Sequence, residues 1–424
     1  MKKAISFLTV MILAVGLLAG CNSSNSSASG KGGAAKSVEL KVFIDQPRFK
    51  QQYQTYLDQF VAKEKKEKNI IVSVKLELPN INQASQLLKT RMASGDSPDV
   101  FSLHAINDIP VYSRAGYLED LSDQPFVKKL YNTVKPAVTY KGKVYAVPLE
   151  TVQWGYLYNK KIFNDLGLKL PQTISEMEQT VKTLKQHNVT PFLLAYKDAY
   201  IPQLFLPLTV GADQIKDKPN FITNMNEGKG SFSEIKDMFN IMDLSNSNGT
   251  PNPFEIGQDQ GASDFANGKA AMWIQGPWMA DSILQANKNF EFGVAPLPVN
   301  NNPATTQLDL TTSTSLAVSK SSKNKAVAKD LINYILDDKD SSAFYKSLGF
   351  NPISKIHNFE QFPWLKESST YVAEGKAYQD PSIPSSVKDE SQKIFQSYFA
   401  GDASKKDVIA DLDRAWKEFN NNNK

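Results

Sequence analysis

Near its start the chain alternates between two kinds of hydrophobic periodicity. Apolar residues repeat at every second position in 38–44 and again in 70–78, a pattern typical of β-strands. Between and after these segments, apolar residues recur at helical spacing in 49–60 and 87–92, and a further short strand begins at Val100. Strand–helix–strand alternation favours parallel pairing, so the pattern predicts an α/β fold, a mostly parallel sheet with helices on both faces.

The length of the chain predicts more than one folding unit. Of its 424 residues, roughly 390 follow position 37, which is too many for one ordinary domain and indicates two lobes. Cys21 is the only cysteine, so the body must be held together by core burial without a disulfide. The formal net charge is +4 and no basic stripe is present, which argues against nucleic acid as a partner.

The N-terminal segment has the pattern of an export signal. Lys2 and Lys3 precede an apolar run over 4–18, which is shorter than the roughly 20 residues of a membrane-spanning helix. The run ends in Leu-Ala-Gly-Cys at 18–21, which resembles the lipobox of bacterial lipoproteins. The resemblance implies that 1–20 is a signal peptide and that Cys21 receives a diacylglyceryl group. The alternative is a general signal sequence that happens to stop near a cysteine.

The residues after Cys21 predict how the body is attached. Segment 21–37 is rich in Ser, Gly and Asn, without apolar periodicity, and we interpret it as the lipidated cysteine and a flexible linker. The chain is then expected at the extracytoplasmic face of a cell membrane, attached by the lipid alone. A Gram-positive type of surface is preferred, although a lipobox fits a periplasmic face equally well.

Later segments predict further strands and helices. Thr173 is a candidate helix N-cap, with Glu176 three residues on completing a capping box. Strands are expected at 144–148, 156–160 and 316–318, and helices at 326–336 and 408–419.

A series of short motifs runs through the chain. In order, they are RMASGDSPDV at 91–100, GYLEDL at 116–121, GKVYAVP at 142–148, LYNKKIF at 157–163, FANGKAAM at 265–272, QGPW at 275–278 and PLP at 296–298. Each motif alone is weak, but their order and spacing resemble the extracellular solute-binding proteins, family one, of carbohydrate ABC importers, the relatives of maltose-binding protein.

The resemblance implies two α/β lobes of discontinuous chain joined by a hinge. The crossings between lobes would lie near 148–153, near 308–312 and after Gly349. Lobe one would comprise 38–150 and 312–352, and lobe two 151–311 and 353–424. The family function would be capture of a sugar, here an oligosaccharide, by hinge closure and its delivery to the permease subunits of an importer driven by a cytoplasmic ATPase. A monomer without cofactor or catalytic activity is expected.

Trp278 is the leading candidate for a ligand contact. Sugars offer hydroxyls and apolar C–H faces, so their sites pair aromatic rings with polar side chains. Trp278 follows Gly276-Pro277 in a motif whose tryptophan stacks on sugar in the resembling maltose binder; a core tryptophan is the alternative. Trp154, beside Glu150 and Gln153 at the first crossing, is a candidate either for ligand contact or for packing.

The other candidates lie at expected strand ends and crossings. Ligands of parallel sheets bind at the carboxyl ends of strands. The candidates chosen on this basis, or by their place in the family, are Asp45, Arg48, His104, Asn107, Asp108, Tyr200 and Asp309. A solvated loop position is the alternative for Arg48, and a structural role is the alternative for His104.

The sequence leaves other functions open. The three histidines are scattered without metal-ligand spacing, so no metal is expected, and no nucleophile elbow or phosphate loop is present. A lipid-anchored glycoside hydrolase remains the rival, because two carboxylates form no recognisable motif. Polyamines, ferric iron and peptides are the rival ligands, and the pairing of Trp278 with Trp154 favours sugar over them.

Overall fold

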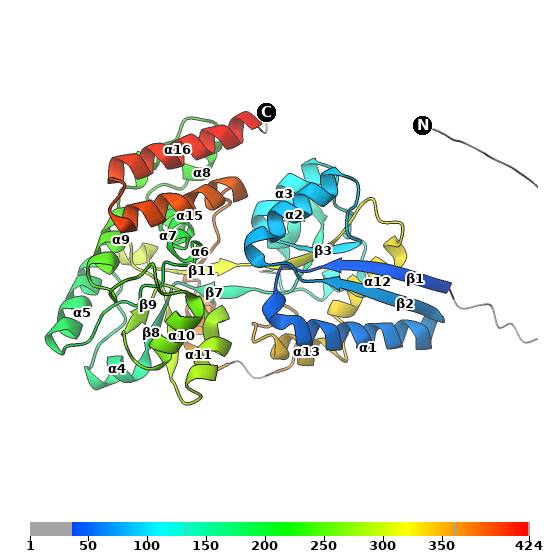
Figure 1. Ribbon diagram of the computed structural model, residues 1–424, viewed down its shortest axis with the longest axis horizontal. Helices are drawn as coiled ribbons and strands as arrows, with labels where there is room; N and C mark the ends of the chain where they lie inside the picture. Colours follow the sequence, from blue (N-terminus) through cyan, green and yellow to red (C-terminus); the bar gives the residue numbers. More distant parts are fainter. Residues whose placement is uncertain (1–35, 133, 360–361, 423–424) are drawn as a thin grey trace, which may run out of the picture.

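The computed structural model describes residues 36–132, 134–359 and 362–422. These residues form two lobes that lie side by side, with β7 and β11 between them (Figure 1). Cys21, the signal peptide and most of the expected linker lie outside the described residues. Within the described part, none of the helices combines the length and apolar character that a membrane crossing requires.

Lobe one is built on a sheet with the strand order β2-β1-β3-β12-β6. Its elements are β1 (Lys36–Phe43), α1 (Lys50–Lys68), β2 (Ile70–Glu77), α2 (Ile81–Ala93), β3 (Val100–Leu103), α3 (Ala105–Arg114), β4 (Thr139–Tyr140), β5 (Lys143–Val144), β6 (Ala146–Pro148), β12 (Ser315–Val318), α12 (Lys325–Ile335) and α13 (Ser341–Ser347). β1 pairs in parallel with both β2 and β3, as the alternating pattern predicts, and β12 pairs antiparallel to β3 and β6.

The start of the body lies slightly earlier than expected. β1 begins at Lys36, which pairs with Ile70 of β2, and Ser37 pairs with Ile71. The last two residues of the expected linker 21–37 are therefore part of the sheet. They are exposed, which is why no hydrophobic alternation marks them.

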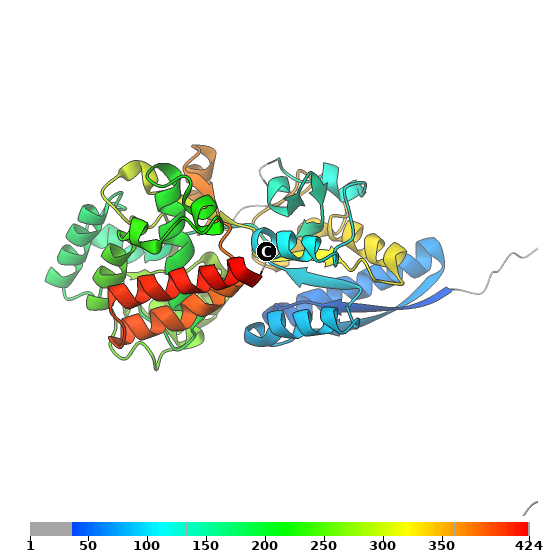
Figure 2. The same cartoon turned by 90° about the horizontal axis from the view of Figure 1, so that it is seen from above.

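Lobe two carries a sheet of order β10-β8-β9 and another of order β13-β11-β7. Its elements are β7 (Val152–Trp154), β8 (Tyr156–Asn159), α4 (Lys160–Asp165), α5 (Ile174–Gln186), α6 (Tyr200–Gln203), α7 (Phe205–Lys216), α8 (Phe221–Asn226), α9 (Met238–Ser247), α10 (Gln258–Ala266), β9 (Met272–Trp273), α11 (Ala280–Ala286), β10 (Phe292–Ala295), β11 (Leu308–Thr311), α14 (Lys366–Ala373), β13 (Ala377–Gln379), α15 (Ser385–Ala400) and α16 (Lys405–Asn422). α15 and α16 lie along each other in both views (Figures 1 and 2).

The N-terminus of α5 confirms the predicted cap. Thr173 Oγ1 accepts a hydrogen bond from the backbone N–H of Glu176 at 3.2 Å. The Glu176 carboxylate in turn accepts from the N–H of Gln172 at 2.7 Å, one residue before the position of a standard capping box. The N–H groups of Ile174 and Ser175 donate to the carbonyl oxygen of Asn300 and to Oδ1 of Asn301, so the first N–H groups of the helix have partners.

The chain exchanges between two separate hydrophobic cores. Leu149 packs in the core of lobe one and Val152 in that of lobe two, and the chain returns between Leu308 and Leu316. Ile353 still packs with the core of lobe one. The partly buried Phe359 packs there too, and Trp364 packs against the other core. The final change of core therefore follows Phe359, later than the expected boundary at 352/353, because the apolar residues after α13 face lobe one.

Candidate ligand-binding site

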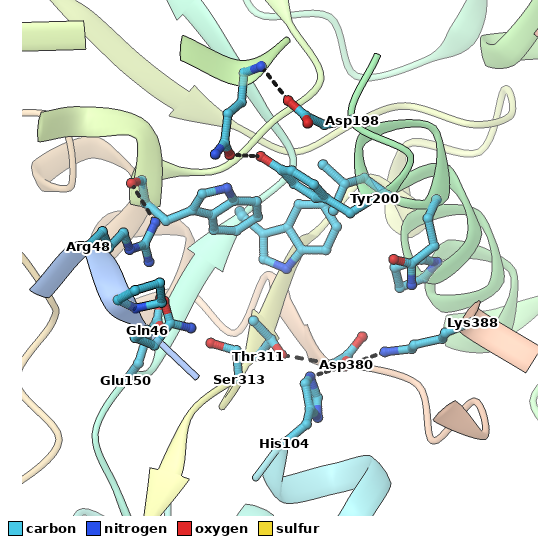
Figure 3. A pocket seen from close by; sticks show the side chains of 17 residues that line it. Gln46, Arg48, His104, Glu150, Asp198, Tyr200, Thr311, Ser313, Asp380 and Lys388 are labelled. Atoms are coloured by element: carbon cyan, nitrogen blue, oxygen red, sulfur yellow. Dashed lines mark hydrogen bonds and ion pairs between the residues drawn. The ribbon is translucent and has the colours of Figure 1, made fainter. Parts of the chain in front are cut away.

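A cavity of about 360 Å³ lies where the two lobes meet (Figure 3). It is lined by Gln46, Pro47, Arg48, His104, Glu150, Trp154, Asp198, Tyr200, Gln203, Leu204, Pro207, Gln258, Trp278, Thr311, Ser313, Asp380 and Lys388. Segments from both lobes contribute, and a volume of this size suits a small organic ligand.

Two tryptophans form one wall of the cavity. Trp154 comes from β7 and Trp278 from the short 3-10 helix Pro277–Met279. Their ring centroids lie 5.3 Å apart with an interplanar angle of 62°, an edge-to-face arrangement. Trp154 is only 3% exposed, whereas Trp278 is partly exposed, so Trp278 offers more ring surface to a ligand.

The position of the Trp278 ring depends on Gly276. A Cβ atom on Gly276 would lie 2.0 Å from Cζ3 of Trp278, so the ring packs where any other residue would place a side chain. We expect Gly276→Ala to displace the ring and to weaken ligand binding about tenfold or more. Calorimetric titration with the ligand checks this result, and unchanged affinity would contradict it.

A matched control for that prediction is available at Gly95. Its backbone φ of +80° also disfavours alanine, but its added Cβ would meet no atom within 4 Å, and Gly95 is outside the cavity. Gly95→Ala should therefore lower stability without changing affinity.

Lobe two supplies a hydrogen-bonded polar wall. The Tyr200 hydroxyl donates to Gln258 Oε1 at 2.8 Å and accepts from Gln275 Nε2 at 3.1 Å. Asp198 accepts from the backbone N–H of Gln258 at 2.7 Å, which fixes the first residue of α10 beside α6. These side chains are therefore held in place before a ligand binds.

Lobe one supplies charged groups opposite this wall. Glu150 is buried, and the Thr314 hydroxyl donates to its Oε2 at 3.4 Å. Burial raises the pKa of Glu150, and the nearby Arg48 guanidinium opposes that increase. Arg48 is exposed and its Nη1 donates to the carbonyl oxygen of Trp278 at 3.2 Å, a direct contact between the lobes.

A cluster of His104, Asp380 and Lys388 closes the cavity at the other side (Figure 3). Lys388 Nζ lies 3.2 Å from Asp380 Oδ2, and His104 Nε2 lies 3.7 Å from the same oxygen. Thr311 Oγ1 is 3.4 Å from it. Burial, and next the charge of Lys388, lowers the pKa of His104 to about 4, so the imidazole is neutral at pH 7.

Residues 48–341 match the family described as bacterial extracellular solute-binding protein. The chain belongs to this family. The resemblance drawn from the motifs and the two-lobed α/β fold are thereby confirmed.

Individual relatives of this solute-binding protein cover most of its length. It is 29% identical over 353 residues to the multiple sugar-binding protein of Streptococcus mutans, which covers 81% of this chain and 80% of the relative. A solved chitin oligosaccharide binding protein superimposes with a TM-score of 0.78 at 22% identity, over 91% of this chain and 99% of that one. The solute-binding protein RafE in complex with raffinose gives 0.73 at 22%, over 90% and 100%. At such identities these two structures show the shared fold.

Several predicted site residues of the solute-binding protein line the cavity. They are Arg48, His104, Glu150, Trp154, Tyr200 and Trp278. They were chosen at expected strand ends, at the first crossing, in the QGPW motif or by their place in the family, and the structure brings all six to one cavity.

Three other predicted site residues, Asp45, Asp108 and Gln153, are absent from the cavity lining. Asp45 Oδ1 accepts from Ser102 at 2.8 Å, which ties β1 to β3. Asp108 Oδ2 accepts from the backbone N–H of His104, the residue before α3, at 2.9 Å, and its Oδ1 accepts from the Ser385 hydroxyl at 2.9 Å. Gln153 points to the opposite face of β7 from Trp154, because successive residues of a strand alternate. Asp45 and Asp108 thus have structural partners in this structure, and ligand contact at all three positions stays a prediction.

Asn107 and Asp309 are also outside the lining. Asn107 is buried beside the cavity, next to His104. Asp309 is fully buried in β11, opposite Trp154 of β7. Among the described residues, neither carboxyl oxygen of Asp309 has a hydrogen-bond partner, and burial together with Asp380 raises its pKa well above the usual range.

The sequence reasoning missed part of the lining. The polar residues concerned are Gln46, Asp198, Gln203, Gln258, Thr311, Ser313, Asp380 and Lys388. Gln46 is next to the predicted Asp45, and Asp198 is two residues before the predicted Tyr200. Including the sequence neighbours of each predicted residue would have found both. Asp380 follows β13 directly and precedes a proline, which is a strand-end signal, whereas nothing in the sequence distinguishes Lys388 from other helical lysines.

Within the described ranges, His, Cys, Asp and Glu side chains form no group of three or more that can hold a metal ion. The arrangement of the cavity instead suits a polar organic ligand with an apolar face. Aromatic rings form one side of it, and carboxylate, amide, guanidinium and hydroxyl groups from both lobes form the others.

Proposed function

We propose that this protein captures a sugar, most suitably an oligosaccharide, and delivers it to the permease subunits of an ABC importer. The observation that carries the proposal is the edge-to-face pair of Trp154 and Trp278 on the cavity wall. Aromatic rings stack on the C–H faces of sugars, and the charged and amide groups around them can bind hydroxyls. The aromatic pair together with these polar groups matches the two kinds of surface that a sugar offers.

The distribution of these groups supports capture by hinge closure. Arg48, His104 and Glu150 belong to lobe one, whereas Tyr200, Trp278 and Lys388 belong to lobe two. A ligand that contacts both sets interacts better with closed lobes than with separated ones. It therefore shifts the population towards closure by this difference in affinity.

The names of relatives support the same class of ligand. Besides the multiple sugar-binding protein, the melibiose/raffinose/stachyose-binding protein of Bacillus subtilis is 26% identical over 306 residues. Both names give sugars as the ligands of these relatives. A cavity in which carboxylates are accompanied by Arg48 and Lys388 suits such ligands better than a polycation.

We further propose that Cys21 anchors the protein by lipid to the extracytoplasmic face of the cell membrane, where it works as a monomer. Two acyl chains hold a protein stably at a bilayer, since each buried CH₂ contributes about 0.8 kcal/mol. The Cys21→Ser variant should then appear in the culture medium or periplasm rather than in the membrane fraction. Retention of that variant in washed membranes would contradict the proposal.

A thermal-shift screen over mono- and oligosaccharides, followed by calorimetry, tests the proposed ligand class. We expect at least one oligosaccharide to raise the melting temperature and to bind near micromolar Kd, about −8 kcal/mol. Stabilisation by spermidine or peptides alone would overturn the sugar proposal. Turnover of an oligosaccharide by the purified protein would show a glycoside hydrolase instead.

A further inference from the structure

Asn107 lies in the first turn of α3, at the junction of the two lobes, and is 7% exposed. Its side-chain amide is surrounded by His104 of lobe one and by Ile383 and Lys388 of lobe two. Two of these neighbours, His104 and Lys388, line the ligand cavity, whereas Asn107 does not. Any effect of Asn107 on the ligand must therefore act through its neighbours.

The two neighbours from lobe two fix the orientation of the amide. The carbonyl oxygen of Ile383, 2.8 Å away, can only accept a hydrogen bond, so it faces Nδ2 of Asn107. The ammonium of Lys388, 3.0 Å away, can only donate, so it faces the amide oxygen. The reverse orientation would place donor against donor and acceptor against acceptor.

This orientation determines the tautomer of His104. The Asn107 amide oxygen also lies 3.0 Å from Nδ1 of His104. An oxygen cannot donate, so Nδ1 must carry the hydrogen and donate it to Asn107. In a neutral imidazole, Nε2 then has a free lone pair and acts as an acceptor.

The surroundings of His104 keep it neutral at pH 7. Burial, the largest cause, and the charge of Lys388 disfavour the imidazolium, whereas Asp380 and Asp108 favour it, and the pKa of His104 is lowered to about 4. Nε2 lies 3.7 Å from Asp380 Oδ2, too far for a hydrogen bond between them. Two acceptors thus stand side by side at the cavity wall.

We propose that Asn107 is a positioning residue that holds His104 in the Nδ1–H form, so that His104 Nε2 and Asp380 make a subsite for hydrogen-bond donors of the ligand. With a sugar, the donors are hydroxyl groups, and this part of the inference rests on the proposed function. Ile383 and Lys388 belong to lobe two, so they orient the Asn107 amide only when the two lobes are in contact. His104 Nε2 therefore becomes a fixed acceptor when the lobes close. Lobe closure and recognition of the ligand hydroxyl are thereby linked.

Nitrogen NMR of the histidine rings tests the tautomer without any ligand. In the ¹⁵N-labelled protein, we expect the His104 ring to carry its hydrogen on Nδ1 at pH 7. His357 provides an internal contrast, because the backbone N–H of Ile353 donates to its Nδ1 at 3.2 Å, which requires the Nε2–H form. Signals are identified with His104→Gln and His357→Gln. An Nε2–H form of His104 in the unmodified protein would overturn the proposal.

Asn107→Asp gives a second, functional test. A carboxylate at this position stabilises the imidazolium, so the titration midpoint of His104 should rise by at least about two pH units. Protonation turns Nε2 into a donor, so the Kd of the sugar found in the screen should rise at least tenfold from pH 8 to pH 5. In the unmodified protein, the Kd should change less than threefold over that range. Equal pH profiles would contradict the proposal.

Asn333→Asp is the matched control, since it adds the same charge to lobe one. Asn333 lies in α12, and its amide bonds to Gln124, Lys329 and Phe126. Asn333→Asp should leave the titration midpoint of His104 and the pH dependence of the Kd unchanged.

If no sugar binds the unmodified protein, the proposed function fails, whereas the tautomer measurement still decides the role of Asn107. The same measurement suffices if Asn107→Asp does not fold.

Discussion

Trp278→Ala is expected to lower the affinity for the sugar at least tenfold, about 1.4 kcal/mol or more. The partly exposed Trp278 ring stands at the cavity wall and meets Trp154 edge to face at 5.3 Å. Its removal deletes the stacking surface and also leaves Trp154 without its aromatic neighbour. Calorimetric titration gives the change in affinity, and urea unfolding should show a loss of stability below about 2 kcal/mol.

Trp273 offers a control for this prediction. Trp273 is 1% exposed in the core of lobe two and is absent from the cavity lining. Trp273→Phe should therefore lower the free energy of unfolding and leave the affinity unchanged. If Trp278→Ala instead lowers stability and spares affinity, Trp278 is a core residue and the sugar proposal loses its main support.

The sequence predicted the first half of lobe one, where the strands are long and one face of each strand is less buried than the other. In β1 the apolar alternation from Val38 onward matches the buried positions, and β1, α1, β2, α2 and β3 occur in the predicted order. Short strands buried on both faces, such as β8, carry no alternation, although a strand was expected at 156–160. Periodicity also cannot specify that β12, more than 200 residues later, pairs with β3.

The candidate site was also predicted only in part, since some of the predicted residues line the cavity and others do not. Trp278 was chosen because it lies in a motif and Glu150 because it lies at a crossing, and both line the cavity. Asp45 and Asp108 were chosen on the same grounds, but their carboxylates are used by Ser102 and by the N-terminus of α3. Which partner a carboxylate finds is a property of tertiary packing, so sequence position alone does not reveal it.

Asp380→Asn is expected to reduce both stability and ligand affinity. Its carboxylate pairs with Lys388, and their side chains are only 3% and 12% exposed. Removing one partner of a buried ion pair leaves an uncompensated charge, which typically costs about 3–5 kcal/mol. We expect a loss of about 3 kcal/mol in the free energy of unfolding, measured with urea. Affinity should fall at least tenfold, because both partners line the cavity.

A double-mutant cycle separates the pair from its surroundings. Lys388→Met removes the cation with little change of volume, and the double variant with Asp380→Asn buries neither charge. We expect the double variant to be more stable than the sum of the single losses predicts, with a coupling of about 2 kcal/mol. The exposed pair Lys161 and Asp165, 2.6 Å apart, should show no measurable coupling in the same cycle. Additive losses at Asp380 and Lys388 would mean that the cluster is not a charge pair in solution, and the acceptor subsite beside His104 would then lose the carboxylate that Lys388 holds in place.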